Sequence, residues 1–110
     1  MRVVEYVRPD GTSPFGRWFE SLDAMAAARV TTALSRIEKG NTSRLKWFRG
    51  IGECVIDWGP GLRVYLTKAG DALILLLGGG TKRTQFEDIR RAMALNHEYR
   101  ERKRFGTGEA

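Results

Sequence analysis

Two cationic side chains that follow glycine-rich segments are the strongest candidates for a chemical role in this sequence. Arg63 comes directly after the turn sequence of residues 59–62, Gly-Pro-Gly-Leu, and Lys82 follows the three glycines at 78–80. Glycine permits sharp bends and close approach of the backbone. A cation on a sheet and another on an adjoining loop can converge on one phosphate. The pattern therefore predicts a small basic protein that grips RNA and cleaves it.

Cleavage of RNA by its own 2′-hydroxyl needs a proton acceptor, stabilisation of the charged phosphorus oxygens and a proton donor for the leaving oxygen. We predict that Arg63 stabilises the charge, because its planar fork matches two phosphate oxygens, and that Lys82 makes a second phosphate contact. The alternatives are a strand-face salt bridge for Arg63 and a solvated loop position for Lys82. Glu53 could act as the base or orient Arg63. Tyr65 shares a strand face with Arg63 and could donate a proton, stack on a base or pack against a helix.

The composition favours an anionic partner and gives no sign of a cofactor. A net charge of +6 and a sequence pI near 10 favour a polyanion or an acidic protein. No cluster has the spacing of metal ligands, so we predict neither metal nor cofactor. Cys54, the only cysteine, is predicted to lie in the core, and His97, the only histidine, at the surface. Four further residues are predicted to contact RNA or to supply general electrostatics: Lys46, Arg49, Arg83 and Gln85.

The hydrophobic pattern predicts one α+β domain over residues 1–110, with the element order β-α-α-β-β-β-α. The last three strands form a meander with short turns, which implies an antiparallel sheet with the helices packed on it. An aromatic stripe in the first helix is predicted to face the core rather than to stack on bases. The expected strands are 3–7, 53–57, 62–67 and 72–77, and the expected helices are 14–22, 24–39 and 84–102, followed by a frayed tail from 100 to 110. The final helix is expected to bury Phe86, Ile89, Met93 and Tyr99.

The motifs at residues 19–22, 37–41, 50–53, 59–65 and 76–85 resemble those of the RelE/HigB-like toxins of bacterial type II toxin–antitoxin modules. The resemblance is closest to the addiction-module killer proteins and covers nearly the whole chain in order. Its most specific part combines Gly-Pro-Gly, Arg-x-Tyr and Gly-Gly-x-x-Lys. The resemblance implies a microbial-ribonuclease-like sheet with helices on one side. It also implies a cytoplasmic endoribonuclease, or mRNA interferase, that cuts messenger RNA, usually on the ribosome, and is silenced by a cognate helix-turn-helix antitoxin.

Three differences from the family pattern keep other functions open. Val55 and Leu62 replace an arginine and a tyrosine that the killer-protein group usually carries, and Phe86 is the nearest match to a tyrosine at the start of the last helix. One alternative is a degenerate member that only binds its antitoxin. Another is a ParE-like toxin that poisons DNA gyrase, because one fold can carry different functions.

Overall fold

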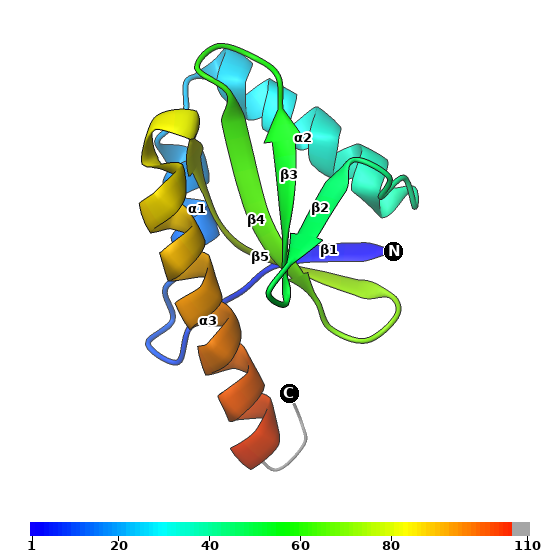
Figure 1. The fold of residues 1–110 in the computed structure, drawn as a ribbon, viewed down its shortest axis with the longest axis vertical. Coiled ribbons are helices and arrows are strands. Elements are labelled where there is room, and N and C mark those ends of the chain that lie inside the picture. The colour runs from blue at the N-terminus through cyan, green and yellow to red at the C-terminus, as the bar shows by residue number, and fades with distance from the viewer. Residues whose placement is uncertain (107–110) are drawn as a thin grey trace.

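Five strands form one mixed sheet in the order β1-β5-β4-β3-β2, in a computed structural model that describes residues 1–106 (Figure 1). The single α+β domain was therefore predicted correctly, but the element order lacked one strand, β2. The elements are β1 (Arg2–Glu5), α1 (Pro14–Glu20), α2 (Ala24–Glu38), β2 (Leu45–Phe48), β3 (Ile51–Ile56), β4 (Leu62–Lys68), β5 (Leu73–Thr81), a 3-10 turn (Lys82–Thr84) and α3 (Gln85–Phe105).

The unpredicted strand β2 pairs with β3 in a tight antiparallel hairpin. Phe48 lies opposite Ile51, so only Arg49 and Gly50 form the turn. Their φ angles are 52° and 83°, which lie in the left-handed region that two-residue hairpin turns require. Arginine is an unusual residue at the first of these positions, where asparagine or aspartate is usual, so the sequence carries a weak turn signal here.

The sheet is not wholly antiparallel, which corrects the predicted pairing. The pairs β3–β4 and β4–β5 are antiparallel as predicted. However, β1 runs parallel to β5, with Val4 opposite Leu75, so β5 is an interior strand between β1 and β4. Strand β5 also continues through the glycines at 78–80, beyond the predicted end at residue 77.

Helices cover both faces of the sheet, so the expectation of helices on one side was wrong. Strand residues alternate between the faces. Val64 and Leu66 pack with α1 and α2, including Val30, whereas Tyr65 and Leu77 pack with α3. The aromatic stripe of the first helix lies in the α1/α2 core as predicted, and consists of Phe15, Trp18, Phe19 and Leu22.

Local capping explains where the first two helices begin. The Ser13 hydroxyl accepts a hydrogen bond from the Gly16 amide at 3.0 Å, and Pro14 occupies the first turn of α1. The Asp23 carboxylate accepts one from the Ala26 amide at 2.8 Å at the start of α2. Both helix starts were predicted from these residue types.

The final helix is longer than predicted, and three of the four residues predicted for its buried side pack against the core. It continues to Phe105, so residues 100–105 are helical rather than frayed, and residues 107–110 lie outside the described part of the chain. Phe86 is 75% exposed, because it lies at the start of α3 beyond the edge of the packed face. Ile89, Met93 and Tyr99 do pack against the core. Within residues 1–106, no helix has the length and apolar character needed to span a membrane.

Candidate functional site

Arg63 and Glu53 form an ion pair on the sheet face that α3 partly covers. The Arg63 Nε atom lies 3.3 Å from Glu53 Oε2, and the two side chains are 13% and 4% exposed. The same Oε2 atom accepts a hydrogen bond at 2.9 Å from Gln85 Nε2 at the start of α3. The carboxylate is thus held by a hydrogen bond from α3 and by an ion pair from β4, in which Arg63 Nε itself makes no hydrogen bond within residues 1–106. This contact has the geometry needed to orient Arg63, one of the two roles predicted for Glu53.

The structure brings Arg63 and Lys82 together at Gly61, as the sequence predicted. The Gly61 carbonyl accepts hydrogen bonds from Arg63 Nη1 at 3.3 Å and from the Lys82 amide at 3.1 Å. A Cβ atom placed on Gly61 would lie 3.4 Å from Arg63 Nη1 and 3.8 Å from Lys82 Cβ. Gly61 has a φ of 80°, which favours glycine. The turn thus sets the guanidinium of Arg63 beside the exposed Lys82.

Tyr65 is completely buried beneath α3 and presents no ring face to solvent. Of the alternatives left open by the sequence, packing against a helix is what the structure shows, and stacking on a base is not available in this conformation. Its hydroxyl makes no hydrogen bond within residues 1–106. Burial and the nearby Glu53 carboxylate raise the pKa of Tyr65 well above its ordinary value of 10.0. The phenol therefore stays protonated near neutral pH.

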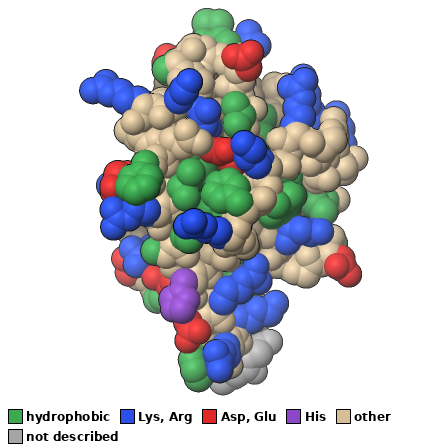
Figure 2. All heavy atoms as spheres, in the orientation of Figure 1, with side chains coloured by type: hydrophobic (Ala, Val, Ile, Leu, Met, Phe, Trp, Pro, Cys, Tyr) green, Lys and Arg blue, Asp and Glu red, His purple; other side chains and the backbone are tan. Residues whose placement is uncertain are grey.

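Of the four predicted RNA contacts, three are exposed cations and one is a side-chain amide that is hydrogen-bonded within the protein. Lys46 lies opposite Glu53 in the β2–β3 register and is exposed, as are Arg49 in the hairpin turn and Arg83 in the 3-10 turn. Gln85 is partly buried and donates to Glu53, so its role here is to hold the ion pair. On this face of the molecule, Lys and Arg side chains surround exposed apolar side chains (Figure 2).

One contact beside the site was not predicted from the sequence. The Thr84 hydroxyl donates to the Asp88 carboxylate, one turn further along α3. A Cβ atom on Gly80 would overlap Asp88. Gly80 lies opposite Arg63 in the β4–β5 register, so this pair borders the ion-pair site. The Thr-x-x-x-Asp spacing in a predicted helix start was the available signal.

The residues that depart from the family pattern lie in three different surroundings. Val55 is 42% exposed and lies opposite Arg63, so it lines the site. Leu62 is buried in the core beneath α1 and α2, on the other face, and does not line the site. Phe86 is exposed at the start of α3. Of the two strand positions, Val55 thus shares the face of Arg63 and Leu62 does not.

The two remaining chemically interesting residues lie where predicted. Cys54 is buried in the α1/α2 core, and burial raises the pKa of its thiol. His97 is exposed on α3. Within the described residues, no group of three or more His, Cys, Asp or Glu side chains could hold a metal ion.

Comparison with known proteins found a relative of this chain. No family model matches the sequence. A protein of Haemophilus influenzae (strain ATCC 51907 / DSM 11121 / KW20 / Rd), described as an uncharacterized protein, is 38% identical over 89 residues. The aligned region covers 79% of this chain and 90% of the relative.

Proposed function

We propose that this chain, which belongs to the same family as the uncharacterized Haemophilus influenzae protein, is the toxin of a toxin–antitoxin module and cleaves messenger RNA. The supporting observation is the convergence of Arg63 and Lys82 at the Gly61 carbonyl, with Glu53 ion-paired to Arg63. The sequence motifs that resemble RelE/HigB-like toxins supply these same residues. The proposed partners are translated messenger RNA on the ribosome and a cognate helix-turn-helix antitoxin.

In this proposal, Arg63 stabilises the negative charge that develops on the phosphorus oxygens, and Lys82 holds the phosphate. Preorganised cations act most strongly on charge that appears in the transition state. Arg63 is fixed by Glu53 and by the Gly61 carbonyl, which reduces the reorganisation needed when the phosphate arrives. Lys82 is exposed and would hold the phosphate in both the ground state and the transition state, so its contribution is to binding.

We assign Glu53 to orientation rather than to proton transfer. Its side chain is 4% exposed and its Oε2 atom already contacts Arg63 and Gln85, so it is poorly placed to take a proton from substrate. Tyr65 is buried with a raised pKa and is equally poorly placed to reach the leaving oxygen. In the proposed step the 2′-oxygen bonds to phosphorus as the bond to the 5′-oxygen breaks, and solvent water takes the 2′-hydroxyl proton and protonates the 5′-oxygen. The protein's part is positioning and charge stabilisation, which agrees with cleavage of a message that the ribosome holds in place.

Induced expression in a bacterial host tests this proposal. Growth should stop without the antitoxin, and mapped 5′ ends should reveal cuts in messages under translation but few cuts in the same RNA when naked. Co-expression of a cognate antitoxin should restore growth. Altered plasmid supercoiling with intact messages would instead support gyrase poisoning.

A degenerate, antitoxin-binding member is the second candidate, and one feature of the site favours it. Val55, which is apolar, lies directly opposite Arg63, and the neighbouring Tyr65 is buried. These two positions thus provide no exposed polar group for proton transfer. Normal growth and intact messages at confirmed soluble expression would favour this reading over the ribonuclease.

A further inference from the structure

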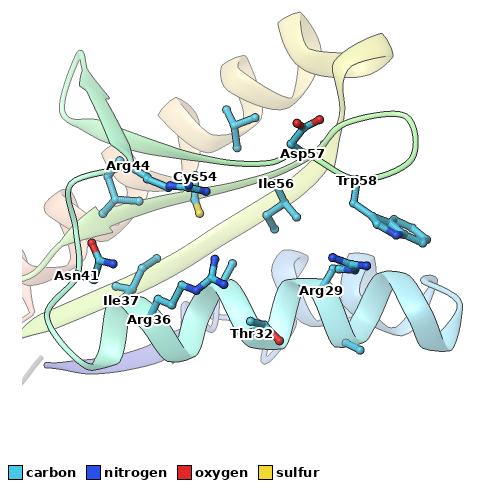
Figure 3. Close-up of a pocket in the computed structure, with 14 residues that line it drawn as sticks. Arg29, Thr32, Arg36, Ile37, Asn41, Arg44, Cys54, Ile56, Asp57 and Trp58 are labelled. Atoms are coloured by element: carbon cyan, nitrogen blue, oxygen red, sulfur yellow. The ribbon is translucent and has the colours of Figure 1, made fainter.

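A groove on the opposite side of β3 from the ion pair is lined by three arginines. It lies between α2 and the outer edge of β3 and has a volume of about 360 Å³. Arg29 and Arg36 extend into it from α2, and Arg44 extends from the segment before β2 (Figure 3). Ile37 and Ile56 contribute an apolar floor. We call this feature the arginine groove.

The charge of the arginine groove is not neutralised by its surroundings. Within the described residues, none of its three arginines is ion-paired with a carboxylate, and Asp57 is the only acidic residue that lines it. Arg29 lies over the Trp58 ring, 5.9 Å from its centroid. Arg29 and Arg36 are seven residues apart, which places them on one side of α2, about 10 Å apart along its axis. Such a row of cations fits an elongated anionic ligand.

The strand that borders the groove has a free outer edge. Strand β2 pairs with β3 only from Phe48–Ile51 to Leu45–Cys54. The next two residues of β3, Val55 and Ile56, pair with β4 on their inner side, but no described strand pairs with them on the outer side. The Ile56 carbonyl already accepts a hydrogen bond from the Trp58 amide at 2.9 Å, so Val55 supplies the free backbone groups of this edge. Alternate backbone N–H and C=O groups of a strand point to each side. An unpaired edge of this kind is a template for another strand.

We propose that the arginine groove binds an acidic peptide segment of a partner protein. The segment lies extended beside residues 55–57, adds a short strand to the outer edge of β3, and directs its carboxylates to Arg29, Arg36 and Arg44. Main-chain hydrogen bonds supply affinity in this mode of recognition, and side-chain pockets supply specificity. The 10 Å between Arg29 and Arg36 corresponds to about three residues of extended chain.

The free strand edge favours a peptide over a nucleic acid as the occupant. A phosphate backbone would satisfy the arginines but leave the alternating donors and acceptors of the β3 edge without a matching ladder. The apolar floor formed by Ile37 and Ile56 also suits the alternate side chains of a strand. The groove is separate from the ion pair of Arg63 and Glu53, so this proposal does not depend on ribonuclease activity.

Titration of the isotope-labelled protein with a probe peptide of alternating Glu and Val residues tests the proposal by NMR. Saturable shifts should appear at the backbone amides of residues 55–57 and along the inner side of α2. The same peptide with N-methyl groups on alternate residues should bind at least tenfold more weakly, since it cannot form the ladder. Absence of shifts at residues 55–57, or equal binding of the methylated peptide, would overturn the proposal.

A matched pair of variants tests the role of charge. Replacing two groove residues, Arg36→Gln with Arg44→Gln, should raise the Kd of the probe peptide at least tenfold, because both side chains are exposed and line the groove. The control Arg17→Gln removes an exposed arginine of α1 outside the groove and should leave the Kd unchanged. Equal affinities for both variants, or shifts at residues 55–57 with an RNA oligonucleotide but not with the peptide, would show the assignment to be wrong.

Discussion

Glu53 of β3 lies opposite Tyr65 of β4, yet its carboxylate is paired with Arg63, which precedes Tyr65 by two residues on β4. The contact is therefore a diagonal one between neighbouring strands, within reach of two long side chains. The direct neighbour, Tyr65, faces the same carboxylate with a hydroxyl whose pKa is raised by burial and by Glu53. A single buried carboxylate thus influences both the cation and the phenol of the predicted site.

The stability of the ion pair can be measured with a double-mutant cycle. Arg63→Gln leaves a nearly buried carboxylate without its cation and should lower the free energy of unfolding by about 3 kcal/mol. Glu53→Gln combined with Arg63→Gln should cost less than the sum of the two single changes, with a coupling of about 1–2 kcal/mol. Urea denaturation of the four proteins gives these values. Strict additivity would mean that the two side chains do not interact in solution.

Loss of Arg63 should abolish toxicity. Arg63→Ala should reduce the rate of message cleavage by about 10²-fold or more, as loss of one preorganised donor does elsewhere. Arg63→Lys should restore little, because a point charge lacks the fork, and Lys82→Ala should have a smaller effect. Growth and mapped cleavage at equal expression provide the measurement.

The folded state of the Arg63 variant needs its own control. Glu53→Gln with Arg63→Ala removes the buried charge together with its partner, so this double variant should be more stable than Arg63→Ala alone. It should remain non-toxic while still binding the antitoxin. Full growth arrest by this folded double variant would remove Arg63 from the proposed site.

Tyr65 should make the protein sensitive to alkaline pH. Its pKa is raised in the folded state, whereas an exposed tyrosine in the unfolded chain loses its proton near pH 10. Stability is therefore full below that value and falls as the pH rises further, because the unfolded state binds fewer protons. In Tyr65→Phe, the decline in the free energy of unfolding between about pH 9 and 12 should be shallower. Parallel curves for parent and variant would contradict the raised pKa of Tyr65. The pKa of Tyr6 is also raised, but Tyr6 is present in both proteins and so does not affect the comparison.

Two neighbouring glycines of β5 should differ sharply in their tolerance of alanine. A Cβ atom on Gly79 would overlap the Trp18 ring, whereas one on Gly78 meets nothing within 4 Å. Gly79→Ala should lower the free energy of unfolding by about 1–3 kcal/mol through overpacking. Gly78→Ala, the matched control, should leave it unchanged or raise it by about 0.5 kcal/mol. Thermal and urea denaturation would distinguish these outcomes, and equal stabilities would argue against close packing of α1 on β5.

Replacing Arg49 in the hairpin turn should raise stability and weaken RNA binding. Arg49 has a φ of 52°, a conformation that asparagine adopts more easily. Arg49→Asn should therefore raise the free energy of unfolding by up to about 1 kcal/mol. The same change should weaken RNA binding and flatten its salt dependence, because one exposed cation is lost. An unchanged salt slope would exclude Arg49 from the RNA contacts.

Patterns confined to neighbouring residues predicted much of this molecule. Ser13-Pro14 and Asp23 identified the starts of two helices, and the Arg63–Tyr65 spacing placed both side chains on one strand face. The convergence of Arg63 and Lys82 followed from a short hairpin, whose register local turns largely determine. These features depend on contacts between residues that are close in sequence.

Features that depend on distant contacts were not predictable from the sequence. The parallel pairing of β1 with β5 joins segments about 70 residues apart, and no local pattern specifies it. The burial of Tyr65 depends on the position of α3, which could have covered either face of the sheet. Phe86 has the apolar character of a core residue, and its exposure follows only from where α3 meets the sheet.

The position of β5 between β1 and β4 has a consequence for the order of events during synthesis. Strand β1 leaves the ribosome before the other described strands, but its partner in the sheet, β5, ends at Thr81. Contacts of such high sequence separation form slowly, because a long loop must close before they stabilise the chain. The parallel β1–β5 pair cannot form until β5 has been translated and has left the exit tunnel. A nascent chain therefore carries β1 unpaired until β5 has emerged.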